Sequence, residues 1–297
     1  MSDTKENVAK AFDFDSLWNY NDPAATEEKF NKVLPQIKES GRTSDYLQLL
    51  TQIARTYGLR MKFDDSHKLL DEVEKQLNNA DSKTKVRYLL ERGRTFNSSG
   101  KINEARELFL EAFDLAVESN EDNLAVDAAH MVGIVESDKR SLQWNEKALA
   151  LAENSSDPKA NKWLGSLYNN IGWTYFSMKQ YEKALELFKK DAVWYEQNNV
   201  RNYVNVAKWS AAKTLRMMGK TDEALEEQLR LHELFLNGEA EEDGYVYEEL
   251  AECYRLKDNN DQTKHFAALA YEILSKDIWM EANEKERLDR LKTLGGK

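Results

Sequence analysis

The sequence predicts an all-α fold, built as a solenoid of about six helix hairpins. The first observation is composition: 12 Gly and 3 Pro in 297 residues, with 32% charged residues, favour long exposed helices over a β-rich fold, which needs more turn residues. The second observation is a period. A small residue recurs every 39 or 40 residues, usually with an aromatic residue three positions later, at Ala54, Gly93, Gly133, Gly172, Ala212 and Ala251. A fixed period of this length is typical of stacked repeats.

Residues 86–122 indicate how one period folds. Leu89, Gly93 and Phe96 share one face of a first helix, because positions i, i+4 and i+7 align on a helix. The stretch Ser98–Gly100 ends that helix, and a second helix follows whose apolar face carries Ala105, Leu108, Phe109 and Ala112. Small side chains at Gly93 and Ala105 let the two backbones approach closely, so each period predicts a helix hairpin.

The hairpins are expected to form one repeat domain, residues 23–283, with units starting near 47, 86, 126, 165, 205 and 244. Residues 1–22 are expected to be an N-terminal tail. Asp22 and Pro23 predict the start of a capping helix over about 23–40, with Asp22 as N-cap, and Pro35 is a position where that helix can kink. Residues 284–297 predict a short charged capping helix and a tail, the polar-faced end that a solenoid needs.

The best-defined unit is residues 168–188, which carries Tyr168, Ile171, Gly172, Tyr175, Tyr181, Ala184 and Phe188. This pattern resembles that of tetratricopeptide (TPR) repeats, and it recurs over about residues 24–275. The resemblance implies a right-handed α-α superhelix whose first helices line a concave groove, where family members usually bind extended peptides or helices. The period exceeds the 34 residues of a standard TPR, which implies longer helices or turns. The third unit, shortened near Ser137–Arg140, and the fifth, with Lys208 in an apolar slot, depart further.

Charge and composition exclude several classes of function. The net charge of -11 disfavours nucleic acid and anionic membranes as partners, since both need clustered Lys and Arg. The single cysteine, Cys253, cannot form an intramolecular disulfide, and no apolar run approaches the roughly 20 residues that span a bilayer, so a soluble cytoplasmic protein is expected. The four histidines are scattered, and no glycine-rich strand-to-helix loop is present. We therefore expect no metal, no cofactor and no enzymatic activity.

The partner-binding residues are expected on the groove-facing side of the first helices, and the candidates are Arg55, Arg87, Arg94, Asn97, His130, Asn169, Asn170, Trp173, Trp209, Lys213, Glu248 and Glu252. Arg55, Arg87 and Arg94 would make the early groove basic. Arginine suits carboxylates because its planar fork donates two parallel hydrogen bonds, so an acidic segment or a C-terminal carboxylate is the expected ligand there. Pairing of Arg87 with Glu91, at i and i+4, is the alternative.

The rest of the groove has a different chemistry. Asn170 carries an amide that can both donate to and accept from a peptide backbone, or bond a neighbouring helix instead. Trp173 and Trp209 would be aromatic anchors for a partner, or would pack between repeats. The late groove is expected to be acidic because it carries Glu248, Glu249 and Glu252.

These observations favour a non-enzymatic adaptor that binds a protein or peptide in the concave groove. The alternative is a sensor that binds a small ligand or signal peptide between repeats and changes its superhelical pitch. A third hypothesis is an enzyme of an unrecognised type. A sensor should gain thermal stability with a small ligand, whereas an adaptor should bind a macromolecule with little change in shape.

Overall fold

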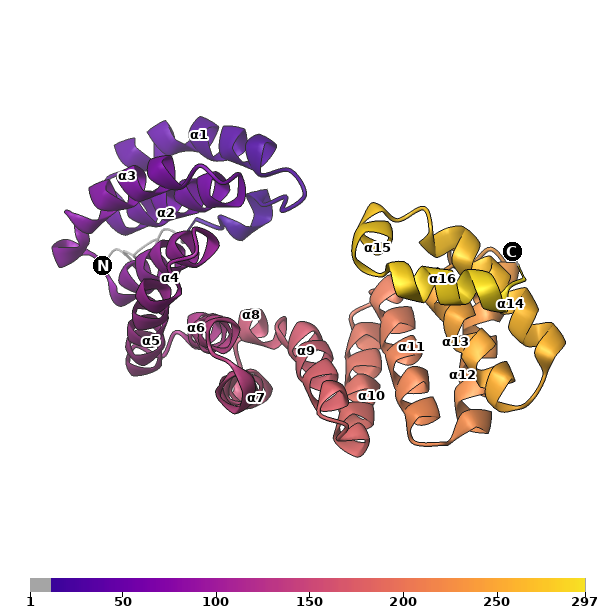
Figure 1. Ribbon diagram of the computed structural model, residues 1–297. Helices are drawn as coiled ribbons and strands as arrows, with labels where there is room; N and C mark the ends of the chain where they lie inside the picture. Colours follow the sequence, from indigo (N-terminus) through magenta and orange to yellow (C-terminus); the bar gives the residue numbers. More distant parts are fainter. Residues whose placement is uncertain (1–11, 297) are drawn as a thin grey trace, which may run out of the picture. The chain divides into compact units, whose positions relative to one another are not determined.

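The computed structural model describes residues 12–296, which form helices, turns and loops with no β-strand among them. Residues 1–11 of the predicted tail 1–22 lie outside the described residues, as does Lys297. The chain divides into two compact units, Met1–Trp163 (unit 1) and Leu164–Lys297 (unit 2; Figure 1). Within residues 12–296 the two units hold six helix hairpins, so the predicted all-α repeat fold is confirmed.

Unit 1 contains three hairpins that follow a single helix, α1 (Pro23–Glu39). The hairpins are α2 (Thr43–Leu59) with α3 (Phe63–Glu74), α4 (Ser82–Ser98) with α5 (Ile102–Glu118), and α6 (Asp122–Val135) with α7 (Asp138–Asn154). Three short elements complete the unit: the 3₁₀ turns η1 (Asp15–Leu17) and η2 (Leu77–Asn79), and the one-turn helix α8 (Pro158–Asn161). Neighbouring first helices, α2 with α4 and α4 with α6, are in contact.

Unit 2 contains the other three hairpins. They are α9 (Leu164–Ser177) with α10 (Tyr181–Gln197), α11 (Arg201–Met217) with α12 (Thr221–Leu236), and α13 (Gly244–Leu256) with α14 (Asn260–Leu274). Two short helices, α15 (Ile278–Asn283) and α16 (Lys285–Leu294), close the unit. The charged helix α16 packs on α14 and buries Leu288 and Leu291.

The recurring small residue lies where the two helices of a hairpin meet. A Cβ atom at Gly93 would come within 2.5 Å of Cε1 of Phe109, and one at Gly172 within 2.7 Å of Cε1 of Phe188. Real Cβ atoms do not approach another carbon so closely, because interiors are packed at van der Waals contact. At Gly133, the recurring position between them, the neighbour is Nδ2 of Asn145 at 2.6 Å. The glycines of the period therefore mark the points where the two helices of a hairpin approach most closely.

The helix ends are set by polar residues. The side chain of Asp22 accepts a hydrogen bond from the backbone N–H of Ala25 at 2.9 Å, which starts α1 at Pro23. Asp81 does the same for α4 through the N–H of Thr84 at 2.8 Å. Most first helices begin one to four residues before the predicted unit starts, because the first turn of each helix is polar and carries no packing pattern.

Candidate functional site: a basic face on the first helices of unit 1

Two of the three predicted groove arginines are held by carboxylates on neighbouring first helices. Arg55 on α2 donates to both carboxylate oxygens of Glu91 on α4, each at 3.2 Å. Arg94 donates to Glu91 at 2.8 Å and also pairs with Asp127 on α6. Burial lowers the pKa of Arg94, but the charges of Asp127 and Glu91 outweigh that effect and raise it. Arg55 and Arg94 thus join α2, α4 and α6 and are largely neutralised.

Arg87 is placed differently. Its side chain is 12% exposed, yet its Nε has no hydrogen-bond partner among residues 12–296. The pairing with Glu91 that the sequence offered as an alternative is not the one observed, because Glu91 is engaged by Arg55 and Arg94. The carboxylate beside Arg87 is that of Asp15, whose Oδ1 lies 3.9 Å from Nη2. A nearly buried guanidinium with an unused donor is costly and is unusual in proteins.

Arg87 opens into a cavity of about 370 Å³. Of the described residues that line it, five are cationic and three are carboxylates, so the cavity carries a net positive charge although the chain is acidic. Lys159 and Lys162, at α8, were not predicted from the repeat pattern. Asp157 and Pro158 start α8, where Asp157 accepts from the backbone N–H of Lys159 at 2.8 Å. We call the surface formed by Arg55, Arg87, Arg94, Lys159 and Lys162 the basic face.

Residues 12–20, here the N-terminal segment, lie on the basic face. The sequence placed them in the tail 1–22. Lys159 donates to Oδ2 of Asp15 at 2.6 Å, and the indole N–H of Trp18 donates to Oε1 of Gln52 at 3.0 Å. The Arg55 guanidinium lies 5.9 Å from the ring centre of Trp18 and 5.6 Å from that of Tyr20. Cations attract aromatic faces at these distances.

The charge on Asp15 is stabilised by this environment. Burial raises the pKa of Asp15, but the hydrogen bond from Lys159 and the charges of Arg87, Lys159 and Lys162 together lower it below its usual value. The same hydrogen bond raises the pKa of Lys159. The basic face therefore favours an ionised carboxylate at the position of Asp15.

The other two predicted residues of unit 1 have local partners. Nδ1 of His130 lies 3.0 Å from Oδ1 of Asn145 on α7, and its ring centre is 5.6 Å from that of Trp163. Asn97 lines a smaller cavity of about 220 Å³ with Arg55 and Met131. His130 therefore holds its own hairpin together, while Asn97 lies beside the basic face.

In unit 2 the predicted tryptophans form part of an aromatic row, which consists of Trp173, Trp209 and Tyr245 on successive first helices. Ring centres are 5.6 Å apart between the two tryptophans and 5.7 Å apart between Trp209 and Tyr245. The indole N–H of Trp209 donates to the backbone oxygen of Tyr245 at 3.0 Å. Asn170 is exposed and accepts from the amide of Asn169 at 3.2 Å. The row packs the repeats together while leaving its edge partly exposed.

The predicted acidic end of the groove is neutralised by the chain itself. Glu248 accepts from Nε of Arg287 on α16 at 2.8 Å, and Glu252 pairs with Arg255 at 3.0 Å and with Arg290. Glu249, which is 1% exposed, accepts from Lys213 and from Nε of Arg216, both at 2.6 Å. The late groove that was expected to be acidic, at Glu248, Glu249 and Glu252, holds a set of internal ion pairs, and Lys213 is one of the partners. The sequence could not show these pairs because α16 supplies two of the arginines.

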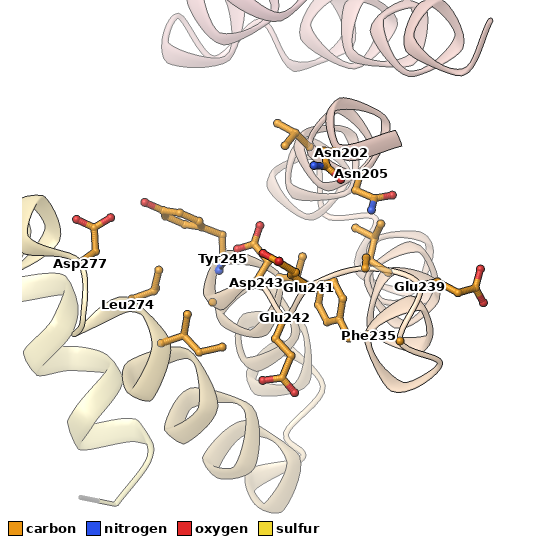
Figure 2. Close-up of a pocket in the computed structure, with 17 residues that line it drawn as sticks. Asn202, Asn205, Phe235, Glu239, Glu241, Glu242, Asp243, Tyr245, Leu274 and Asp277 are labelled. Carbon is orange, nitrogen blue, oxygen red and sulfur yellow. Dashed lines mark hydrogen bonds between the residues drawn. The ribbon is translucent and has the colours of Figure 1, made fainter. Parts of the chain in front are cut away.

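A larger cavity of about 660 Å³ lies in unit 2 between α11, the loop before α13 and the end of α14. Figure 2 shows Asn202 and Asn205 on one side of it and Asp277 on another, with the carboxylates of Glu239, Glu242 and Asp277 pointing in different directions. Asp243 in this loop is the N-cap of α13 and accepts from the N–H of Tyr245 at 2.8 Å. The carboxylates do not converge on a common point.

In the described part of the chain, no group of three or more His, Cys, Asp or Glu side chains could hold a metal ion. None of its helices combines the length and apolar character needed to cross a bilayer.

Comparison with known proteins agrees with the repeat architecture. The tetratricopeptide-repeat family model matches residues 164–196, within α9 and α10. RNA polymerase-associated protein CTR9 of Caenorhabditis elegans is 30% identical over 142 residues, which are 46% of this chain and 12% of that protein, so this chain spans a small part of the relative's length.

Three solved structures share the fold at low identity. The apo form of RapI is 14% identical with a TM-score of 0.75, covering 95% of this chain and 79% of that one. A signal transduction ATPase with a tetratricopeptide repeat sensor, from Pyrococcus horikoshii, is 16% identical with a TM-score of 0.69, covering 91% and 44%. Aspartyl phosphate phosphatase F from Bacillus subtilis is 14% identical with a TM-score of 0.52, covering 88% and 74%. The hairpin formed by α9 and α10 thus matches the tetratricopeptide-repeat family model, and the six hairpins have the architecture of TPR-like solenoids.

Proposed function

We propose that this chain is a protein-binding scaffold without enzymatic activity, and that its ligand is an acidic peptide segment bound on the basic face. The observation that carries this proposal is Arg87, whose guanidinium lines a positively charged cavity and comes no closer than 3.9 Å, at Nη2, to the Asp15 carboxylate. A ligand carboxylate within hydrogen-bond distance of the Nη atoms would pair with Arg87 more closely than Asp15 does. Charge-assisted bonds of this kind are about twice as strong as neutral ones.

The surrounding contacts prepare the face for such a ligand. Arg55 and Arg94 are fixed by Glu91 and Asp127, so the walls of the cavity need little reorganisation on binding. The carboxylates beside Arg87 and Lys159 are those of the N-terminal segment: Asp15 lies 3.9 Å from Arg87, and Lys159 pairs with both Asp13 and Asp15. The names of two similar proteins, an RNA polymerase-associated protein and an ATPase with a repeat sensor, agree with a binding role for repeats of this type.

The test is selection from a random peptide display library on the immobilised full-length chain. Selected peptides should be enriched in Asp and Glu. The Arg87→Glu variant should bind them about tenfold or more weakly, which is about 1.4 kcal/mol. The matched control is Lys68→Glu, the same charge change at an exposed position of α3. Equal affinity for wild type and Arg87→Glu would contradict the proposal.

A second candidate, the small-ligand sensor, is favoured only by the 660 Å³ cavity of unit 2. Its acidic lining would suit a cationic ligand. A thermal-shift screen of small cations and amines checks this: stabilisation that Asp277→Asn removes would support it, and the absence of any shift would count against it.

A further inference from the structure

The N-terminal segment has the chemistry that the basic face is built to accept. Asp15 occupies the carboxylate position, 2.6 Å from Nζ of Lys159 and 3.9 Å from Nη2 of Arg87, and Asp13 lies 3.6 Å from the same Lys159. The segment is thus an acidic stretch lying on a cationic surface. It is supplied by the chain itself, more than 60 residues before Arg87 in sequence and more than 130 before Lys159.

The aromatic half of the segment makes a second set of contacts. The rings of Trp18 and Tyr20 are stacked, with centres 4.7 Å apart and planes 6° from parallel. Trp18 donates to the buried side chain of Gln52, and the Arg55 guanidinium lies over both rings. These contacts bind an aromatic side chain, Trp18, three positions after the Asp15 carboxylate. Aromatic anchors and arginine are the residue types that dominate binding energy at protein interfaces.

The polar contacts of the segment are weak ones. The Asp15 side chain remains 48% exposed, and both Asp13 and Lys159 are at least half exposed, so each ion pair contributes little in water. Phe14, only 3% exposed, is the buried side chain of the segment, and burial of an aromatic side chain stabilises more than an exposed ion pair does. Asn19 keeps the segment attached to α1, because its backbone N–H donates to Thr26 Oγ1 at 3.0 Å and its backbone oxygen accepts from the same hydroxyl at 3.1 Å.

We infer that the N-terminal segment is a built-in competitor for the basic face, and that the partner presents the same chemistry: an apolar residue, a carboxylate directly after it, and an aromatic residue three positions later, as in Phe14, Asp15 and Trp18. This inference rests on the proposed function and specifies its ligand. The partner must displace a segment whose local concentration is fixed by its short connection to α1. Short tethers give effective concentrations of about 1 mM. A segment that binds the face with a dissociation constant of about 0.1 mM or less therefore lowers the apparent affinity of the partner by about tenfold or more.

The test uses a fluorescent synthetic peptide with the sequence of residues 12–20 and the full-length chain. The peptide should bind a Phe14→Ala, Asp15→Ala, Trp18→Ala variant about tenfold or more tightly than wild type. Adding Arg87→Glu to that variant should remove the gain, and adding Lys68→Glu should not. Circular dichroism and a thermal melt check that each variant folds. If the triple variant is unfolded, Asp15→Lys alone breaks the contacts with Lys159 and Arg87 and should give a smaller gain of the same sign.

Two results would overturn the inference. One is equal affinity of the peptide for wild type and for the variant with the weakened segment. The other is the absence of binding to that folded variant. The affinities of the peptides selected from the display library should be measured on the same proteins. This measurement distinguishes a failure of the competition from a failure of the proposed function. If the selected peptides still depend on Arg87 but bind wild type and variant alike, the face binds peptides and only the competition is refuted.

Discussion

Asp191 on α10 gives the sharpest prediction about stability. Its side chain is 1% exposed, and its Oδ1 has no hydrogen-bond partner in the described part of the chain. Burial raises the pKa of this carboxyl to about 7, from the 3.8 of an unperturbed group. Between these two values the folded chain binds more protons than the unfolded chain. The free energy of unfolding therefore falls as pH rises from about 4 to about 7, and the loss is complete above that range.

The size of this loss follows from the shift. Each pKa unit corresponds to about 1.4 kcal/mol, so the full loss is at most about 4 kcal/mol. Asp191→Asn removes the ionisation while keeping the shape of the side chain. Relative to wild type, the variant should gain up to about 3 kcal/mol of stability between about pH 4.5 and pH 8.

The assay is urea unfolding followed by circular dichroism at several pH values, for wild type and Asp191→Asn. The control is Glu186→Gln, which replaces an exposed carboxylate of the same helix. The difference in unfolding free energy between this variant and wild type should change by no more than a few tenths of a kcal/mol between about pH 4.5 and pH 8. If the stability difference between Asp191→Asn and wild type is constant with pH, Asp191 does not ionise in this range and its burial does not raise its pKa.

Three other predictions concern packing and ion pairs, and all are measured as free energies of unfolding. Gly93→Ala should destabilise the folded chain by about 1–3 kcal/mol, because its Cβ would lie 2.5 Å from the Phe109 ring. Gly58→Ala is the control: its Cβ would lie 3.8 Å from Oγ1 of Thr95, so the variant should be as stable as wild type or more stable by up to about 1 kcal/mol. Gly100→Ala should destabilise by about 1 kcal/mol through backbone strain alone, since its φ is 83° and no atom lies within 4 Å. Glu249→Gln should cost about 3 kcal/mol, because it leaves Lys213 and Arg216 without their buried partner. Equal effects of Gly93→Ala and Gly58→Ala, or a stable Glu249→Gln variant, would contradict these assignments.

The hairpins could be predicted because each is specified locally. The spacing of Gly93 and Phe109 lies within one period, and the same spacing recurs at Gly172 and Phe188, so the pattern is visible without knowledge of distant contacts. The first residues of the helices were harder to predict. Residues such as Asp81 fix a helix start through a single hydrogen bond to the backbone, and such residues do not recur with the period of the repeats.

The chemistry of the groove could be predicted only in part. Arg55, Arg87 and Arg94 were correctly placed on first helices, yet which of them are neutralised depends on carboxylates 33 to 36 residues away, on the next first helix. Likewise, the contact of Lys159 with Asp15 joins residues 144 positions apart. The N-terminal segment lies outside the repeat, so no periodicity connects it with the face that it covers.

A crystal structure of the full-length chain with the tightest acidic peptide from the display selection would show where the ligand binds. We expect a peptide carboxylate within hydrogen-bond distance of Arg87 and Lys159, with Asp15 and Trp18 displaced from the basic face. A peptide bound on unit 2, or bound anywhere while Asp15 still contacts Lys159, would contradict this expectation.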